Sequence, residues 1–308
     1  MFCMNINNIT LSQLRTFVAL IESGSFTSAA RTLNVTQPGV SHTIAGLERE
    51  LDVSLVFRGR RGVVPTDMGE RVLLHAREVI RVLERMVQEA EASTGLLAGR
   101  IRIGSFPSAA SRLLPSIIGG FNRRYPEIEV VLMEGTDANV REMIFSRSVD
   151  VGFVSLPSDG LETLPVAEDE ILALVPTDHA LSTMESVDVE SIAGEPFIMS
   201  RGGCEPLIRS IFRSSGLTPD VRFDVRDMET ILALVAEGLG VSLAPKLALP
   251  HSLKGVRAIP LHPSVRRKLA LAVHSLETVS PATIAFMEQA QANRPRLARD
   301  ARAPGGAS

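Results

Sequence analysis

The sequence predicts a chain of three parts: an all-α winged helix-turn-helix head, a long linker helix, and a C-terminal α/β body of two Rossmann-like lobes. Three observations predict this division. Short amphipathic segments separated by turn residues occupy residues 11–51. An apolar repeat without proline follows over residues 67–93. Beyond residue 99, segments of strand character alternate with segments of helical periodicity.

Two short amphipathic helices begin the head. The first is predicted from apolar residues at helical spacing, namely Leu11, Leu14, Phe17, Val18 and Ile21. Gly24 breaks this helix, and the hydroxyl of Ser25 is placed to cap the next one. The second helix carries Phe26, Ala29, Ala30 and Leu33. Together these segments predict the first two helices of a small bundle.

A third helix follows a tight turn at Asn34 and Val35. Thr36 is its cap, and Pro38 lies in its first turn, where proline is tolerated. Its apolar positions face the other two helices: Val40, Ile44, Leu47 and Leu51. Its outer face carries Gln37, Ser41, His42 and Arg49. Such a face either reads a DNA groove or is the solvated side of an ordinary bundle, and we favour DNA.

Residues 53–64 predict a β-hairpin, the wing, whose basic tip contains Arg58, Arg60 and Arg61. The alternative is a solvated loop, but arginines beside a helix-turn-helix usually meet phosphates or the minor groove. Residues 1–66 hold six arginines and four acidic residues, a net charge of +2, whereas the whole chain has 32 basic and 35 acidic residues, a net charge of −3. A modestly basic head on an acidic body fits a sequence-reading protein better than a nonspecific nucleic-acid coat.

The linker helix is expected over residues 67–94, a length of roughly 40 Å at 1.5 Å per residue. This segment contains a single glycine, Gly69, which lies near its start. The apolar residues alternate in steps of four and three: Val72, Ala76, Val79, Leu83, Met86 and Ala90. This stripe could pack on its own domain, but a period of 3.5 over this length favours a partner helix. We therefore predict a dimerisation seam.

The body is expected over residues 95–292, after a hinge at 95–99. Its first half predicts a βαβαβ run with a parallel sheet, from strands at 101–104, 129–133 and 151–154 and helices at 112–125 and 140–145. Residues 164–176 then cross into a second half. The second half predicts strands at 196–199, 221–225 and 241–243 and helices at 206–212 and 230–237. A strand at 269–273 and a helix at 282–292 return to the first half.

Lobe 1 is therefore expected over about 100–168 and 266–292, and lobe 2 over about 169–265, with a cleft between them. The final residues, 293–308, are rich in proline, arginine, alanine and glycine, and we expect them to be disordered.

Several classes of protein find little support in the sequence. The two cysteines, Cys3 and Cys204, form no disulfide framework, and no metal-ligand cluster, nucleophile elbow or phosphate loop favours an enzyme. We expect no catalytic residue, metal or cofactor. No export signal and no run of ~18 apolar residues is found, so a cytoplasmic chain without a membrane span is expected. A two-lobed solute-binding protein, the second rival, would lack the helix-turn-helix.

The motifs together resemble those of a LysR-type transcriptional regulator over residues 9–292. In the head they are Leu14-Arg15-Thr16-Phe17, Gly24-Ser25-Phe26-Thr27-Ser28-Ala29-Ala30, Leu33-Asn34-Val35-Thr36-Gln37-Pro38, Ser41 and Leu47-Glu48-Arg49-Glu50-Leu51. In the wing and its exit they are Arg58-Gly59-Arg60-Arg61-Gly62, Thr66 and Gly69. Asp52, Val56 and Pro65 depart from the family pattern and put the wing contacts in question, not the class.

The resemblance implies a tetrameric regulator with lobes of the periplasmic-binding-protein type, which bends DNA differently when a small molecule enters the cleft. The DNA-binding residues it implies are Arg31, Thr36, Gln37, Pro38, Ser41, His42, Arg58, Arg60 and Arg61. Gln37 can bond adenine, and Ser41 can meet a base or a phosphate. His42 could read a base, or equally touch phosphate or solvent. Arg31 and Arg49 are candidates for contacts to the phosphates of the DNA backbone, and solvated surface is the equal alternative. The expected partners are an interrupted near-palindrome of double-stranded DNA, a dimer of dimers, and RNA polymerase as a further candidate.

The resemblance and the strand ends together place the small-molecule site in the cleft, because free N–H groups and helix dipoles favour anions there. The candidate residues are Ser105, Phe106, Ser108, Ser155, Ser200, Arg201 and Gly202. Ser108 or Ser111 could also cap a helix. Arg201 could form a fork with a carboxylate, which favours an anionic ligand, or it could be surface without a ligand. Cys204 is interpreted as structural or cleft-lining rather than as a redox sensor, because Glu205 opposes a thiolate.

Overall fold

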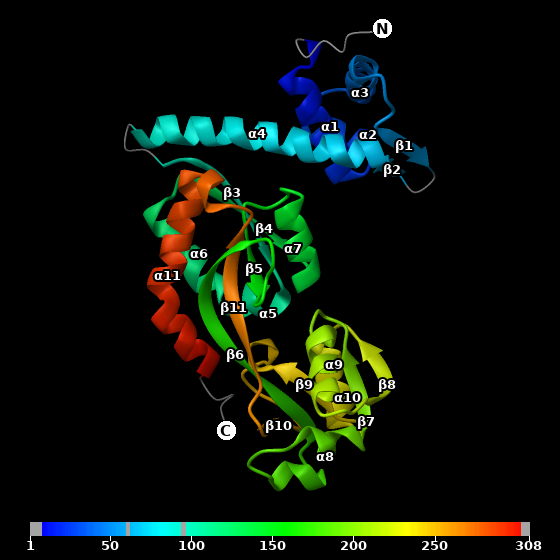
Figure 1. Cartoon of the computed structure of the whole chain (residues 1–308), viewed down its shortest axis with the longest axis vertical. Helices are drawn as coiled ribbons and strands as arrows, with labels where there is room; N and C mark the ends of the chain where they lie inside the picture. Colours follow the sequence, from blue (N-terminus) through cyan, green and yellow to red (C-terminus); the bar gives the residue numbers. More distant parts are fainter. Residues whose placement is uncertain (1–7, 60–61, 94–96, 303–308) are drawn as a thin grey trace. The chain divides into compact units, whose positions relative to one another are not determined.

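The computed structural model describes residues 8–59, 62–93 and 97–302, with side chains to residue 293 (Figure 1). The chain divides into two compact units, of which one holds the N-terminal head with the linker helix and the other holds the α/β body. The predicted fold class is confirmed: a helix-turn-helix head accompanies a body of two lobes built on a mixed sheet.

The head contains the three predicted helices, α1 (Leu11–Ser23), α2 (Phe26–Thr32) and α3 (Gln37–Leu51). Gly24 ends α1 with a left-handed backbone, φ 66°. The hydroxyl oxygen of Ser25 accepts a hydrogen bond from the amide of Ser28 at 3.1 Å and so caps α2. Asn34 makes the turn at φ 54°, and the hydroxyl oxygen of Thr36 accepts from the amide of Gly39 at 3.3 Å. Local capping therefore fixes where each helix begins.

A single apolar core joins these helices to the wing. Phe17, Leu20, Ile44 and Leu47 are fully buried in it. The wing consists of β1 (Val56–Gly59) and β2 (Gly62–Pro65), which pair antiparallel, and Val63 of β2 is buried in the same core. The predicted hairpin is confirmed, and its inner face is part of the head.

The linker helix α4 (Asp67–Ser93) runs over almost the predicted span. The amide of Gly69 is bonded to the Thr66 hydroxyl, 2.9 Å, and a side chain at Gly69 would meet the carbonyl of Leu55. The apolar stripe divides in two. Val72 and Ala76, together with Leu73, pack into the core of the head, so the prediction that the whole stripe forms a seam between chains is wrong for its first two turns.

The rest of the stripe is open in the single chain. Val79 is 44% exposed and Met86 is 57% exposed, Ala90 is exposed, and Leu83 is half-buried. The physical reason for the division is distance. Only the first turns of α4 lie beside the wing and α1, because a helix advances 1.5 Å per residue away from the head.

The first lobe of the body holds the predicted parallel strands, β3 (Gly99–Ser105), β4 (Ile128–Glu134) and β5 (Val151–Ser155), in the order β5-β3-β4. Its helices are α5 (Pro107–Arg112), α6 (Leu114–Arg124) and α7 (Asp137–Phe145). The helix expected at 112–125 is present as α6, and the sequence reasoning missed the short helix α5 before it; Pro115 lacks the N–H that would continue α5 into α6. Helices α6 and α11 lie on one face of the sheet and α7 on the other (Figure 1).

Two long antiparallel strands, β6 (Glu162–Pro176) and β11 (Arg266–Val273), cross between the lobes. They belong to a seven-stranded sheet of order β10-β6-β11-β5-β3-β4, in which β9 also pairs with β6. The expected crossing at 164–176 is therefore one continuous strand. The sequence reasoning missed β10 (Val256–Pro260), whose five residues include only two that are buried and carry a weak strand pattern.

The second lobe contains a parallel pair, β7 (Pro196–Ser200) and β8 (Asp220–Val225), with β9 (Ser242–Pro245) beside them. Its helices are α8 (Val189–Ala193), which the sequence reasoning missed, α9 (Glu205–Ser214) and α10 (Met228–Ala236). Short 3-10 turns occupy η2 (Ala180–Thr183), η3 (Lys246–Ala248) and η4 (Leu276–Thr278). The elements on which the candidate ligand residues were placed are thus present in both lobes.

The last helix, α11 (Pro281–Arg302), is longer than expected. The prediction of disorder from residue 293 is wrong as far as Arg302, since α11 continues through Pro295, and the alanine, leucine and arginine residues after it are good helix formers. Residues 303–308 of the expected tail lie outside the described residues. In the described part of the chain, no helix is both long and apolar enough to cross a membrane.

Candidate functional site

The outer face at the start of α3 presents a row of polar side chains. Gln37, Pro38 and His42 are exposed, and Ser41 is half-buried. Thr36 is exposed as well, although its hydroxyl is engaged in capping the helix. The row stays outside because Val40, Ile44 and Leu47 occupy the opposite side of the helix and hold it against the core. This arrangement leaves amide and hydroxyl groups free to meet base edges.

The wing lies beside this row. Nη2 of Arg58 is 3.5 Å from the hydroxyl oxygen of Ser41, and its guanidinium lies 4.6 Å from the centre of the Phe26 ring. Stacking on Phe26 positions the charge of Arg58 next to the polar row rather than leaving it to move freely. Arg31 and Arg49 are exposed elsewhere on the head. Arg60 and Arg61, at the predicted tip, lie outside the described residues.

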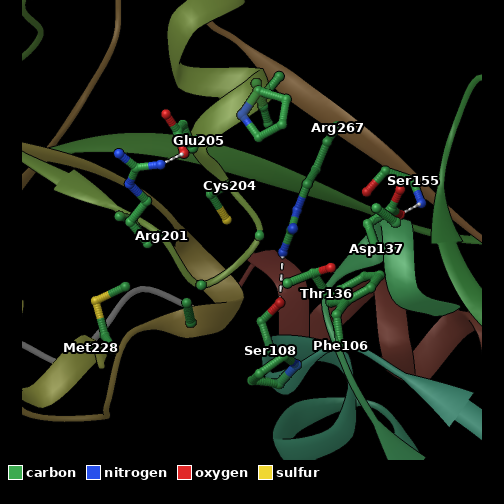
Figure 2. Close-up of a pocket in the computed structure, with 18 of the residues that line it drawn as sticks. Phe106, Ser108, Thr136, Asp137, Ser155, Arg201, Cys204, Glu205, Met228 and Arg267 are labelled. Carbon is green, nitrogen blue, oxygen red and sulfur yellow. Dashed lines mark hydrogen bonds and ion pairs between the residues drawn. The ribbon is translucent and has the colours of Figure 1, made fainter. Parts of the chain in front are cut away.

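A cavity of about 860 Å³ lies between the two lobes of the body (Figure 2). Its size is within the range of small-molecule sites in proteins. Residues predicted for the ligand site line it from both lobes: Phe106, Ser108, Ser155, Ser200, Arg201 and Gly202. Its apolar walls come from Phe106, Pro107, Leu156, Pro157, Pro206 and Met228. The cavity can therefore hold a small molecule with an apolar part.

Arg267, which the sequence reasoning missed, is the buried cation of this cavity. It is 8% exposed and points from β11 towards Ser108, with Cys204 on one side and Asp137 on the other (Figure 2). Its Nη2 donates to Oδ2 of Asp169 at 2.7 Å and to the hydroxyl oxygen of Ser108 at 2.8 Å. The guanidinium also lies 5.0 Å from the centre of the Phe106 ring.

Asp169 of β6 is the counter-ion of Arg267. Its Oδ2 accepts from Nε of Arg267 at 3.0 Å, and its Oδ1 accepts from the amide of Leu247 at 3.0 Å. Burial raises the pKa of the Asp169 carboxyl, and the charge of Arg267 opposes this rise without cancelling it. In the sequence, only the basic run Arg266-Arg267-Lys268 at the start of an apolar segment marked the cation, and no pattern marked Asp169 as its partner.

The match to known proteins covers both units. Residues 11–70 match the family described as bacterial regulatory helix-turn-helix protein, lysR family, and residues 94–295 match the LysR substrate binding domain. The chain belongs to the LysR family of transcriptional regulators. It is similar to YvbU of Bacillus subtilis, an uncharacterized HTH-type transcriptional regulator, with 36% identity over 92% of this chain and 98% of the relative.

The probable regulator LrrA of Synechococcus elongatus shares 31% identity over 94% of this chain and 99% of its own length. Among solved structures, a full-length OxyR variant from Pseudomonas aeruginosa matches with a TM-score of 0.73 and 25% identity, over 92% of this chain and 97% of that one. These likenesses extend over both units, so the head and body occur together in the relatives.

The protein is therefore a DNA-binding transcriptional regulator with an effector-binding domain. Regulators of this family bind DNA and form oligomers, and the family is not enzymatic. Within the described residues, no group of histidine, cysteine and acidic side chains is arranged to hold a metal ion.

Two of the residues predicted for the effector site of this LysR-family protein have side chains that are engaged within their own lobes. Ser105 is fully buried and is not among the residues that line the cavity, and its hydroxyl donates to the carbonyl of Phe106 at 3.2 Å. Arg201 does form a fork with a carboxylate, but the carboxylate is that of Asp224, with both contacts at 3.0 Å. A third contact joins Arg201 to Glu205 at 3.0 Å. Arg201 is thus committed within lobe 2.

The alternative that Ser108 caps a helix is not what the structure shows. Phe106 is the residue before α5 and provides no side-chain cap, while Ser108 accepts from Arg267. Ser155 offers its backbone: its amide donates to Oδ1 of Asp137 at 2.5 Å, and Oδ2 of Asp137 pairs with Arg141 at 2.7 Å. The wall near Ser155 is therefore held together by the chain's own charges.

Cys204 lies just before α9 on the cavity wall. Burial raises the pKa of its thiol, the charges of Asp169 and Asp137 raise it further, and only Arg267 opposes them. The thiol is therefore neutral near pH 7, which agrees with a structural or cleft-lining cysteine. Cys3, the other cysteine, lies outside the described residues.

Proposed function

We propose that this regulator reads DNA with the polar row at the start of α3, and that Gln37, Pro38 and Ser41 face base edges in the major groove. The row is exposed, and the residues behind it are fully engaged in the core. His42 adds a phosphate or base contact. Arg58 supports the same surface from the wing, where its charge is suited to phosphate or the minor groove.

Two heads act together in this proposal. The open part of α4, with Leu83 at its centre, pairs with the same helix of a second copy. The recognised DNA is therefore an interrupted near-palindrome, since the symmetry of a protein dimer is matched by its half-sites. Body-to-body contacts then give a dimer of dimers, and RNA polymerase is the further partner. Because chromosomal DNA is the target, we expect the protein to act in the cytoplasm.

The effector in this proposal is a small anion that binds in the cavity between the lobes. The observation that supports it is the buried guanidinium of Arg267, which faces the cavity beside the hydroxyl of Ser108. A buried cation at the wall of a cavity that also has apolar walls favours a ligand with an acid group. Binding changes the angle between the lobes and, through the bodies, the spacing of the heads and the bend of the DNA.

The DNA half of the proposal is tested by selecting sequences from a random duplex library with the full-length protein. We expect a selected site with two half-sites and a gel shift that weakens steeply as salt rises, because phosphate contacts release counterions. Selected and scrambled duplexes that shift equally at every salt concentration would contradict sequence reading. The effector half is tested by thermal shift of the full chain against small acids, since a ligand of the folded state raises Tm.

A further inference from the structure

The Asp169–Arg267 pair lies where the crossing strands pass from one lobe to the other. The two residues are register partners on β6 and β11. Along β6, Val166 belongs to the core of lobe 1 and Ile171 to the core of lobe 2, so Asp169 lies between the two cores. Any change in the angle between the lobes must bend these strands at or near this pair.

The ion pair with Asp169 uses only part of the Arg267 guanidinium, which also lines the cavity. Nε and Nη2 of Arg267 are both bonded to Asp169, whereas Nη1 has no hydrogen-bond acceptor within the described residues. The hydroxyl oxygen of Ser108 accepts a hydrogen bond from Nη2. Among the described residues, the hydroxyl hydrogen of Ser108 has no acceptor. Nη1 and the Ser108 hydroxyl together offer donors to an oxyanion, on a residue that is more than nine-tenths buried.

The geometry of the pair is not the strongest one that arginine can form. Both donors from Arg267 converge on a single oxygen, Oδ2, because Oδ1 is occupied by the amide of Leu247. A fork in which each donor meets its own oxygen binds more strongly. A carboxylate that enters the cavity can offer one free oxygen to each of two N–H donors of Arg267, an arrangement that Asp169 cannot make while the Leu247 amide holds its Oδ1.

We propose that Asp169 is a built-in competitor of the effector, so that an acid group bound at Arg267 draws this arginine away from Asp169 and loosens the pair between the two cores. The proposal rests on the proposed anionic effector and adds how its binding is passed to the crossing strands. No covalent step is involved. The one exchange is a proton, which moves from solvent to the Asp169 carboxylate as its counter-ion leaves.

The direction of the proton exchange follows from burial. The pKa of Asp169 is already raised with Arg267 in place, and it rises further when that cation turns to the ligand. The complex then holds more protons than the free protein, so affinity for the acid increases as pH falls from 8 to 6. A small carboxylic acid, with a pKa of roughly 4.3, stays ionised over this range.

The charged groups around Asp169 leave few other sources of this pH dependence. The thiol of Cys204 faces the pair, and its raised pKa keeps it neutral below pH 8. Asp137 is paired with Arg141, and Glu205 with Arg201 and Arg209. The other charged residues that line the cavity are Arg226, Arg266, Glu134 and Asp227. No histidine is among its described lining residues. Glu168, Glu170 and Lys268 flank the pair along the strands.

The test is calorimetric titration of the full-length protein with phenylacetate and with phenylacetamide, which has the same shape without the charge. Titrations at pH 6, 7 and 8, in buffers of different ionisation enthalpy, measure protons taken up. We expect phenylacetate to bind at least about tenfold more tightly than the amide, because it alone forms charge-assisted bonds to Arg267. Its affinity should rise by up to about tenfold per pH unit on acidification, with uptake of up to one proton.

Asp169→Asn supplies the matched variant, since it removes the competing charge and keeps an oxygen for the Leu247 amide. It should bind phenylacetate more tightly than the wild type at pH 8, without proton uptake. Glu168→Gln, the same chemical change on the neighbouring exposed residue, should behave as the wild type. If Asp169→Asn does not fold, the wild-type titrations decide alone.

The outcomes separate the two proposals. Binding that prefers the acid but shows neither proton uptake nor pH dependence would overturn the competitor role of Asp169 and leave the anionic effector standing. Equal binding of acid and amide, or saturable binding of neither, would overturn the anionic effector and this inference together. DNA binding by the head would be unaffected in either case.

Discussion

Gln37 is the residue on which the base-reading proposal depends most directly. Its amide can make two hydrogen bonds to one adenine, which are worth about 1–3 kcal/mol of discrimination against the wrong base. We expect Gln37→Ala to flatten the preference at one position of each half-site, with little change at the other positions. Selection from a random library with wild type and variant measures this. Equal losses on all sequences would show that Gln37 contacts the DNA backbone instead.

Arg49 offers a matched comparison on the same helix, since it is exposed but lies about three turns beyond Gln37 along α3. Arg49→Ala should weaken all sequences alike and reduce the salt dependence of binding, because a phosphate contact carries no base information. A changed base preference in this variant would contradict the assignment of Arg49 to the backbone.

Cys204 gives a prediction of pH dependence. Its thiol has a raised pKa, so the reactive thiolate is scarce at neutral pH and becomes available only as pH rises. We expect iodoacetamide to modify Cys204 more slowly at pH 7 than it modifies an ordinary free cysteine. The rate should increase steadily beyond pH 9. Mass spectrometry of the modified peptide measures it, and rapid modification at pH 7 would contradict a neutral thiol.

At the residue scale, the sequence predicts positions better than partners. Thr36, Ser41 and Arg58 lie where the motif spacing places them, because capping and helical periodicity are local. Arg201 was predicted to meet the carboxylate of a ligand, whereas the carboxylate it contacts in the chain is that of Asp224, 23 residues away. Arg267 and Asp169 are 98 residues apart, and nothing local to either indicates the other.

The division of the α4 stripe leads to opposite predictions for two leucines. Leu73 is 7% exposed in the core of the head, so Leu73→Ala should cost about 2–5 kcal/mol of the free energy of unfolding. Leu83 lies in the open part of the stripe, so Leu83→Asp should leave the head folded and abolish dimers and DNA binding together. Calorimetry and sedimentation measure the two effects. A Leu83→Asp protein that remains dimeric would contradict the proposed seam.

At the scale of elements, most helices and strands of this chain are predictable because their signals are local. The exceptions have physical reasons. A heptad stripe cannot reveal which of its turns meet the chain's own core, as Leu73 and Ala76 do. The 310-turn η3 and strand β10 take their place from pairing with β6 and packing in the lobes, so their own residues carry little pattern.

At the scale of the whole molecule, the two crossing strands connect ligand and DNA. Because β6 runs through the cores of both lobes and β11 pairs with it at Asp169, a change at the midpoint of β6 is a change in how the lobes are joined. The family and the two-lobed architecture follow from motifs and alternation along the sequence. The ion pair at the midpoint does not, since strand register is settled only by pairing across the sheet.

The central claim is that an acid bound in the cavity changes how the heads bend DNA. Its most direct test is the end-to-end distance, by fluorescence energy transfer, of a selected duplex bound to full-length protein, with and without the acid that gives the largest thermal shift. The account predicts a changed distance in the wild type and none with Arg267→Ala, which still binds the duplex. An unchanged distance in the wild type with saturating acid bound would contradict the account.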